Sequence, residues 1–241
     1  MMGLVVAALA VSGGAGITKE TVTIDRDKRP YYLYVPDTIG AEPAPLLIAL
    51  HGSNRDGRSI AEPWRDLASR ERFIVAAPDA INHAGWQVPD DGPAFLYFLV
   101  EAVKAKHAVD TRRMYLFGHS AGAGFALTMG LMESEFFAGA AIHAGALQKA
   151  GRDQLLGAPR KLPIMIVHGT RDATVPVASG REANDTLSSH GFPVEFREMP
   201  AHDHNYYVRA DAINRQVWDF LQHAVLAEDA RYQPYSYSPR R

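Results

Sequence analysis

Short apolar runs alternate with amphipathic segments along most of this chain of 241 residues. Runs rich in β-branched residues and bounded by Pro, Gly or Asp indicate strands, whereas apolar residues recurring every three or four positions indicate helices. This alternation predicts an α/β fold, with a mostly parallel sheet covered by helices on both faces. We expect strands at 21–25, 31–35, 46–50, 73–77, 114–117, 139–143, 164–167 and 194–199, and helices at 61–70, 93–105, 121–131, 180–189 and 212–226.

The first two of the eight strands should form an antiparallel hairpin at one edge of the sheet, because residues 26–30 are too few for a crossover. The length favours a single domain, which we place at 17–226. Residues 1–16 resemble the apolar part of a signal peptide, although the positively charged start is missing. We therefore expect a secreted or periplasmic protein, with a cytoplasmic one as the alternative. Residues 227–241 lack periodicity, and we expect them to form a flexible tail.

The composition excludes several kinds of reactive group and binding partner. The chain has no cysteine, which excludes disulfides, thiolate metal sites and a cysteine nucleophile. Its net charge of -2 leaves no basic excess for nucleic acid or an anionic membrane surface. The apolar start is too short to span a bilayer. We expect no nucleic-acid partner, no membrane span and no cofactor, and the reactive groups must come from Ser, His and carboxylates.

The segment Gly118-His-Ser-Ala-Gly122 follows an apolar strand and leads into a helix of small residues. Such a segment predicts a strand, a sharp turn and a helix, with Ser120 at the apex and its hydroxyl exposed. Glycine is needed on both sides because a side chain would collide with the reversing backbone. The five-residue pattern alone arises by chance in roughly one such chain in ten. The surrounding strand and helix make Ser120 the candidate nucleophile.

A serine nucleophile needs an acid and a base, which should follow later strands in the order Ser, Asp, His. Asp172 lies in the polar turn after the strand at 164–167, where it could also simply cap that turn. The loop after the last strand contains His202 and His204. We choose His204 as the base, with His202 as the alternative. We discount a metal site at this His-Asp-His segment because no third ligand with a characteristic spacing is visible.

Several segments together resemble one branch of the α/β-hydrolases, the esterases related to polyhydroxybutyrate depolymerases and to feruloyl or acetylxylan esterases. The resemblance covers about 21–226. It implies that Ser120, Asp172 and His204 are the catalytic triad and that the protein is a serine esterase. Many members of this branch are secreted and act on polymers or plant-wall esters. Two departures leave the substrate open: Ala123-Gly124 replaces Gly-Gly, and Ser53 stands where a cysteine is common. The segments that carry the resemblance are Arg29-Pro-Tyr-Tyr-Leu-Tyr-Val-Pro36, Leu50-His-Gly-Ser53, Trp86 with Asp90-Asp91, Val109-Asp-Thr-Arg-Arg-Met-Tyr-Leu-Phe-Gly-His-Ser-Ala-Gly122 and Phe137-Ala-Gly-Ala-Ala141.

An acyl-transfer site also needs hydrogen-bond donors for the oxyanion that forms. The backbone N–H of Ala121, the residue after the nucleophile, is the first candidate because it lies at the start of a helix. The second should come from the loop His51-Gly-Ser-Asn54, which follows the third strand. We choose the N–H of Ser53, with that of Asn54 as the alternative.

The surroundings of the site should be open. Only residues 144–162 separate the sixth and seventh strands, too few for a lid domain, which favours a bulky, aromatic or polymer-attached ester. Trp86, Tyr206 and Tyr207 could stack on an aromatic acyl group or a sugar, or could pack loops onto the sheet. Asp91, just before Pro93, is expected to cap a helix.

Two other functions share parts of this pattern. A peptidase of the prolyl-oligopeptidase type has the same order of catalytic residues, but usually carries a gating domain. A non-catalytic binding module of the same fold is the second alternative, although such modules usually lose a triad member. The serine esterase remains the leading hypothesis.

Overall fold

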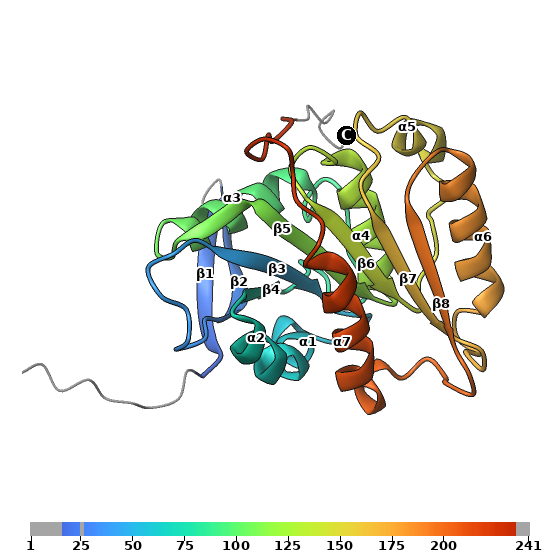
Figure 1. Ribbon diagram of the computed structural model, residues 1–241, viewed down its shortest axis with the longest axis horizontal. Coiled ribbons are helices and arrows are strands. Elements are labelled where there is room, and N and C mark those ends of the chain that lie inside the picture. Colours follow the sequence, from blue (N-terminus) through green and yellow to red (C-terminus); the bar gives the residue numbers. More distant parts are fainter. Residues whose placement is uncertain (1–15, 25–26, 235–241) are drawn as a thin grey trace, which may run out of the picture.

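A computed structural model describes residues 16–24 and 27–234 of the chain. Residues 1–15, and with them almost all of the signal-peptide-like segment, lie outside the described residues. The described part forms one layered α/β unit, shown in Figure 1.

One open sheet of eight strands forms the centre, in the order β1-β2-β4-β3-β5-β6-β7-β8. The first two strands pair antiparallel, as do β2 and β4, and all other pairs are parallel. This confirms the expected edge hairpin and the mostly parallel sheet. The strands are β1 (Thr18–Ile24), β2 (Asp27–Tyr34), β3 (Ala44–Leu50), β4 (Ile74–Pro78), β5 (Val109–His119), β6 (Gly139–His143), β7 (Ile164–Gly169) and β8 (Val194–Met199).

Helices cover both faces of the sheet (Figure 1). One face is covered by α3 (Pro93–Lys104), α4 (Ala121–Met132), α5 (Arg152–Leu156) and α6 (Val177–Ser189), whose apolar residues share one core cluster. The other is covered by α1 (Gly57–Ala61), the 3-10 helix η1 (Glu62–Trp64), α2 (Arg65–Glu71) and α7 (Ala210–Leu221), which share a second cluster. A further 3-10 helix, η2 (Tyr206–Val208), precedes α7.

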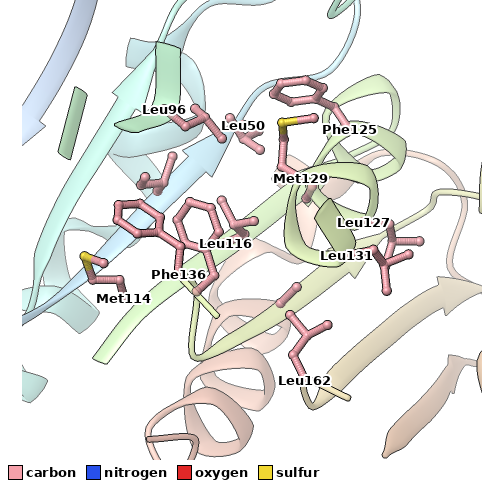
Figure 2. Packing of buried hydrophobic residues seen from close by; sticks show 14 of the residues in the cluster. Leu50, Leu96, Met114, Leu116, Phe125, Leu127, Met129, Leu131, Phe136 and Leu162 are labelled. Carbon is pink, nitrogen blue, oxygen red and sulfur yellow. The ribbon is translucent and has the colours of Figure 1, made fainter. Parts of the chain in front are cut away.

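The central strands are apolar on both sides, which is why they are buried on both faces. Figure 2 shows the larger cluster, in which Leu50 and Leu116 of β3 and β5 lie near Phe125 and Met129 of α4. On the opposite face the rings of Phe73 and Trp218 stack with 3.8 Å between their centroids. Each fully buried large apolar side chain contributes about 1.5–3 kcal/mol. This double core holds the carboxyl ends of the strands in place, and the candidate site lies there.

Some predicted boundaries differ from those observed. Helical structure begins at Gly57 rather than at 61, and the single helix expected at 61–70 is the last residue of α1 followed by η1 and α2, since Pro63 has no N–H to continue an α-helix. Helix α7 ends at Leu221 rather than at 226. The connection between β6 and β7 contains only the five-residue α5, so the described chain has no lid inserted there.

The segment after residue 226 differs from the expected loose tail over its described part. Arg231 donates its N–H to the carbonyl oxygen of Glu135 (3.0 Å) and pairs with the Glu135 carboxylate (2.9 Å). The Tyr232 ring stacks on that of Tyr97 at 4.3 Å, and the N–H of Gln233 donates to Glu133 Oε2. Aromatic stacking and backbone hydrogen bonds that composition does not reveal therefore hold residues up to 233 against α3 and the end of α4.

Asp91 does not cap α3, contrary to the expectation. The N-cap is Gly92, and no side chain caps the helix. The Asp91 carboxylate is fully buried, pairs with Arg29 and accepts hydrogen bonds from the N–H groups of Ile81 and Gln87, each at 2.9 Å. The buried Asp91 carboxylate needs a charged partner, and Arg29 of β2 is that partner. The pair therefore joins the edge hairpin to the loop before α3.

Candidate active site

Ser120 lies at a sharp turn between β5 and α4. Its backbone has φ 56° and ψ -116°, a conformation that residues other than glycine rarely adopt. A Cβ on Gly118 would come within 2.1 Å of the Gly122 carbonyl oxygen, and a Cβ on Gly122 within 2.2 Å of the Leu50 carbonyl oxygen. Atoms cannot approach so closely, so both positions require glycine. The turn holds the Ser120 hydroxyl at the carboxyl end of the central strand, at the surface of the cavity described below.

Ser120, His204 and Asp172 form a hydrogen-bonded chain. His204 Nδ1 lies 2.8 Å from Asp172 Oδ2, and His204 Nε2 lies 2.9 Å from Ser120 Oγ. A carboxylate only accepts hydrogen bonds, so Nδ1 carries the proton and Nε2 of the neutral ring accepts one from the Ser120 hydroxyl. The three side chains come from the ends of β5, β7 and β8, so the sheet brings together residues that are far apart in sequence.

Asp172 combines the two roles considered from the sequence. Its Oδ1 accepts hydrogen bonds from the N–H groups of Thr174 (2.9 Å) and Val175 (2.8 Å), which caps the turn after β7. Its Oδ2 remains for His204. Burial alone would raise the pKa of Asp172, but the hydrogen bonds from His204 and from the two N–H groups outweigh it and lower that pKa. The carboxylate therefore stays ionised and oriented.

His202, the alternative base, belongs to a different chain of side chains. Its Nε2 lies 3.1 Å from His143 Nε2, and His143 Nδ1 lies 3.0 Å from His119 Nδ1. All three rings are buried. Burial lowers the pKa of His119 to about 3, and burial with the neighbouring histidines places the pKa of His143 well below its ordinary value. Three neutral rings thus lie behind the triad and tie the ends of β5 and β6 to the loop carrying His204.

A further histidine supports the acid. His168 Nε2 donates to the Val175 carbonyl oxygen at 2.8 Å and lies 3.5 Å from Asp172 Oδ2. Its Nδ1 is buried with no hydrogen-bond partner, and helix α6 packs so closely that a Cβ on Gly180 would lie 2.6 Å from it. His168 therefore clamps the turn that holds the carboxylate. The sequence pattern does not single out these histidines, and their position at the ends of strands is the one signal that could have found them.

The loop after β3 is held by His51. Its Nδ1–H donates to the Gly52 carbonyl oxygen (2.8 Å), and its Nε2 accepts from the N–H of Ala80 (3.1 Å). Burial lowers the pKa of His51, so the ring stays neutral for these two bonds. The N–H of Asn54 already donates to the His83 carbonyl oxygen at 2.6 Å. Of the two donors considered in this loop, the geometry thus favours the N–H of Ser53.

The Ser120 hydroxyl opens into a cavity of about 370 Å³, within the range of small-molecule sites. Tyr207 lines this cavity, whereas Tyr206 is fully buried and donates its hydroxyl to Asn214 at 2.7 Å. A substrate cannot stack on Tyr206, so that expectation is wrong. Trp86 packs on Phe125 and donates to the His51 carbonyl oxygen, a loop-packing role. The cavity is lined by Gly52, Ser53, Arg55, His119, Ser120, Thr174, His204, Asn205 and Tyr207.

Within residues 16–24 and 27–234, no cluster of three or more His, Cys, Asp or Glu side chains could hold a metal ion. No helix in these ranges is long and apolar enough to cross a membrane.

An eight-stranded, mostly parallel sheet with a serine at the sharp turn after β5, backed by histidine and aspartate from later strand ends, defines an α/β-hydrolase. The chain belongs to the family described as Esterase PHB depolymerase, which matches residues 29–155. A second family, Phospholipase/Carboxylesterase, matches residues 96–215.

Two curated relatives match parts of the chain. A bifunctional acetylxylan esterase/xylanase, XynS20E, of Neocallimastix patriciarum is 28% identical over 149 residues, covering 60% of this chain and 21% of the relative. Poly(3-hydroxyalkanoate) depolymerase C of Paucimonas lemoignei is 33% identical over 131 residues, covering 49% of this chain and 31% of the relative. The matches thus span about a fifth and a third of these longer proteins.

A solved structure shows the same fold. The ferulic acid esterase AmCE1/Fae1A of Anaeromyces mucronatus superposes with a TM-score of 0.71 at 17% identity, over 90% of this chain and 93% of that one.

Proposed function

We propose that this protein is a serine esterase that hydrolyses carboxylic esters through an acyl-enzyme on Ser120. The observation that carries the proposal is the hydrogen-bonded chain from Ser120 through His204 to Asp172, with bonds of 2.9 and 2.8 Å. Its position at the carboxyl ends of the strands and the membership of an esterase family both support it.

The chemistry follows from the direction of these bonds. His204 Nε2 takes the Ser120 proton as Oγ attacks the ester carbonyl carbon, and Asp172 stabilises the imidazolium that results. The N–H groups of Ser53 and Ala121 hold the oxyanion, each such donor contributing about 3 kcal/mol in comparable sites. His204 then protonates the leaving alcohol. Water repeats the sequence on the acyl-enzyme and releases the acid.

The substrate class is proposed from the surroundings of Ser120. The described chain has no lid between β6 and β7, and the cavity lies at the surface with Tyr207 on its wall. An open cavity with an aromatic wall suits a bulky, aromatic or polymer-attached ester. The two relatives, a bifunctional acetylxylan esterase/xylanase and a poly(3-hydroxyalkanoate) depolymerase, are both named for polymer substrates, which supports this substrate class.

The test is a Ser120→Ala variant assayed on 4-nitrophenyl esters beside the matching anilides. The wild-type protein should hydrolyse the esters and label with a fluorophosphonate, and the variant should lose at least about 10⁴-fold in kcat and all labelling. Ser188→Ala, which removes an exposed hydroxyl in α6, is the matched control and should behave as wild type. Ester hydrolysis that persists in Ser120→Ala refutes the proposal, and faster cleavage of the anilides indicates a peptidase. A wild-type protein that neither labels nor hydrolyses favours the non-catalytic binding module.

A further inference from the structure

Arg55 is the one residue with a permanent charge among those that line the cavity beside Ser120, within the described part of the chain. Its backbone is fixed on both sides. The N–H donates to the Gly52 carbonyl oxygen at 3.2 Å, which closes a turn, and its carbonyl oxygen accepts from His83 Nδ1 at 2.8 Å. The position of Arg55 is thus set by the same loop that presents the Ser53 N–H.

The Arg55 guanidinium lies over the ring of Tyr207, with 4.8 Å between its central carbon and the ring centroid. Tyr207 follows His204 in the chain, so this contact bridges the two loops that flank Ser120. The ring attracts the guanidinium through its π-electrons and supplies no carboxylate or carbonyl oxygen to accept its N–H groups. These donors remain available to a second partner in the cavity.

The carboxylates close to Arg55 in the chain or the site are already engaged. Asp56 caps α1 through the N–H of Ser59 at 2.8 Å, and Asp172 is held by His204 and the turn after β7. None of the ion pairs within residues 16–24 and 27–234 includes Arg55. No Asp or Glu lines the cavity. The cavity thus has one cation and no anion of its own.

We infer that Arg55 selects esters that carry a carboxylate in addition to the ester group that is cleaved. A planar guanidinium binds a carboxylate through two parallel hydrogen bonds, which fixes orientation as well as charge. The anion of such a substrate supplies the partner that the cavity lacks. This inference rests on the proposed esterase activity and names the substrate class of the same site.

The test uses two pairs of esters matched in shape, one pair for each side of the scissile bond. For the acyl side, 4-nitrophenyl hydrogen glutarate is compared with 4-nitrophenyl valerate. For the alcohol side, the butyrate ester of 4-hydroxybenzoate is compared with that of 4-hydroxybenzamide. In at least one pair, the wild-type protein should have a kcat/KM about fivefold higher for the anionic ester than for the neutral one. The difference should come from a lower KM rather than from a higher kcat. Arg55 is exposed, and that factor corresponds to about 1 kcal/mol, which is what a well-formed exposed ion pair can contribute. Added salt should reduce it.

Variants at position 55 separate charge from shape. Arg55→Lys keeps the charge but not the two parallel hydrogen bonds, so it should keep only part of the preference. Arg55→Gln should abolish the preference, and Arg55→Glu should reverse it in the pair of esters that shows it. The ratio of kcat/KM for the anionic ester to that for its neutral partner is compared within each variant, so that a general effect of the substitution on both esters cancels. Arg58→Gln, which removes an exposed arginine of α1 outside the cavity, is the matched control and should keep the wild-type ratios.

The outcomes also separate this inference from the proposed function. No preference in either pair, or a preference that survives Arg55→Gln, overturns the role of Arg55 while hydrolysis of the neutral esters still supports the esterase. Neutral esters that are cleaved equally by Ser120→Ala overturn the esterase itself.

Discussion

At the scale of single residues, Gly122 shows how strictly the turn around Ser120 limits side chains. A Cβ there would meet the carbonyl oxygens of Leu50 and His51 at 2.2 and 2.6 Å. We expect Gly122→Ala to destabilise the protein by more than about 2 kcal/mol, because the contacts are with backbone that cannot turn away. It should also lower kcat by displacing Ser120. Urea unfolding and ester kinetics measure the two effects.

Gly124 is the matched control, two residues further along the same helix. A Cβ at Gly124 would have no neighbour nearer than 3.4 Å, an ordinary contact. Gly124→Ala should therefore leave the free energy of unfolding unchanged or raise it by up to about 1 kcal/mol, since alanine favours the helix. Equal effects of the two substitutions would contradict the steric explanation.

Neighbouring residues of one loop could not be told apart from the sequence. His202 and His204 are two positions apart, and Tyr206 and Tyr207 are adjacent. The direction of each side chain depends on partners from other elements: His143 of β6 holds His202, and Asn214 of α7 holds Tyr206. Residue types and chain order predicted Ser120 and Asp172, because each follows an apolar strand directly. No local sequence pattern indicates a distant partner such as His143.

At the scale of elements, His143 ties the end of β6 to the loop after β8. Both ring nitrogens of His143 are engaged, with His119 at 3.0 Å and His202 at 3.1 Å, so one nitrogen donates and the other accepts. His143→Leu leaves both neighbours without their buried partner. We expect a loss of about 2 kcal/mol in the free energy of unfolding.

His143→Leu should also reduce kcat by about tenfold with little change in KM, because the loop that positions His204 loses its anchor. The conservative His143→Gln retains a donor and an acceptor and should recover part of the lost kcat. A variant with lower stability but wild-type kcat would show that His143 holds the fold without positioning His204.

Helices and strands were predicted best where the apolar residues follow the pattern of one element type throughout, as in the eight strands and in α3 and α4. The errors have local causes. Pro63 separates α1 from η1 and α2, so no single helix runs through 61–70, and α5 occupies only five residues of the connection between β6 and β7. The described end of the chain is held by the Tyr232–Tyr97 stack and by Glu133 and Glu135, contacts between segments that composition alone does not pair.

At the scale of the whole molecule, the parallel sheet explains why site residues that are far apart in the sequence lie close together in space. Strands β3, β5, β7 and β8 all end at the same edge, and each is followed by one part of the site: the Ser53 loop, Ser120, Asp172 and His204. Alternation of strands and helices predicted this edge and the order of the parts. It did not predict the buried histidines behind the edge, because a histidine inside an apolar run has the same local pattern whether it packs alone or in a chain.

Those histidines make the stability of the whole protein depend on pH. Burial lowers the pKa of His51 and of His202, of His119 to about 3, and of His143 well below its ordinary value of about 6.5. As the pH falls below about 6.5, the unfolded chain binds protons that the folded protein does not. The free energy of unfolding therefore decreases on acidification, by at most about 1.4 kcal/mol per pH unit for each such histidine.

Glu133 acts in the opposite sense. Burial raises the pKa of Glu133 to about 7, so the folded protein keeps a proton that the unfolded chain releases above about pH 4.5. This single carboxyl favours the folded state toward lower pH within that window, but the four histidines act in the opposite direction and outweigh it. We expect the free energy of unfolding in urea to be at least about 2 kcal/mol lower at pH 5 than at pH 7.

Two variants test the origin of this acid sensitivity. Glu133→Gln removes the opposing carboxyl and should steepen the decrease between pH 7 and pH 5. In His143→Leu one of the titrating histidines is absent, so its deficit relative to wild type should shrink as the pH falls. His190→Asn, which replaces an exposed histidine, should leave the profile unchanged. A wild-type stability that is flat or rises from pH 7 to pH 5 would show that the buried histidines take up protons in the folded state, contrary to their burial.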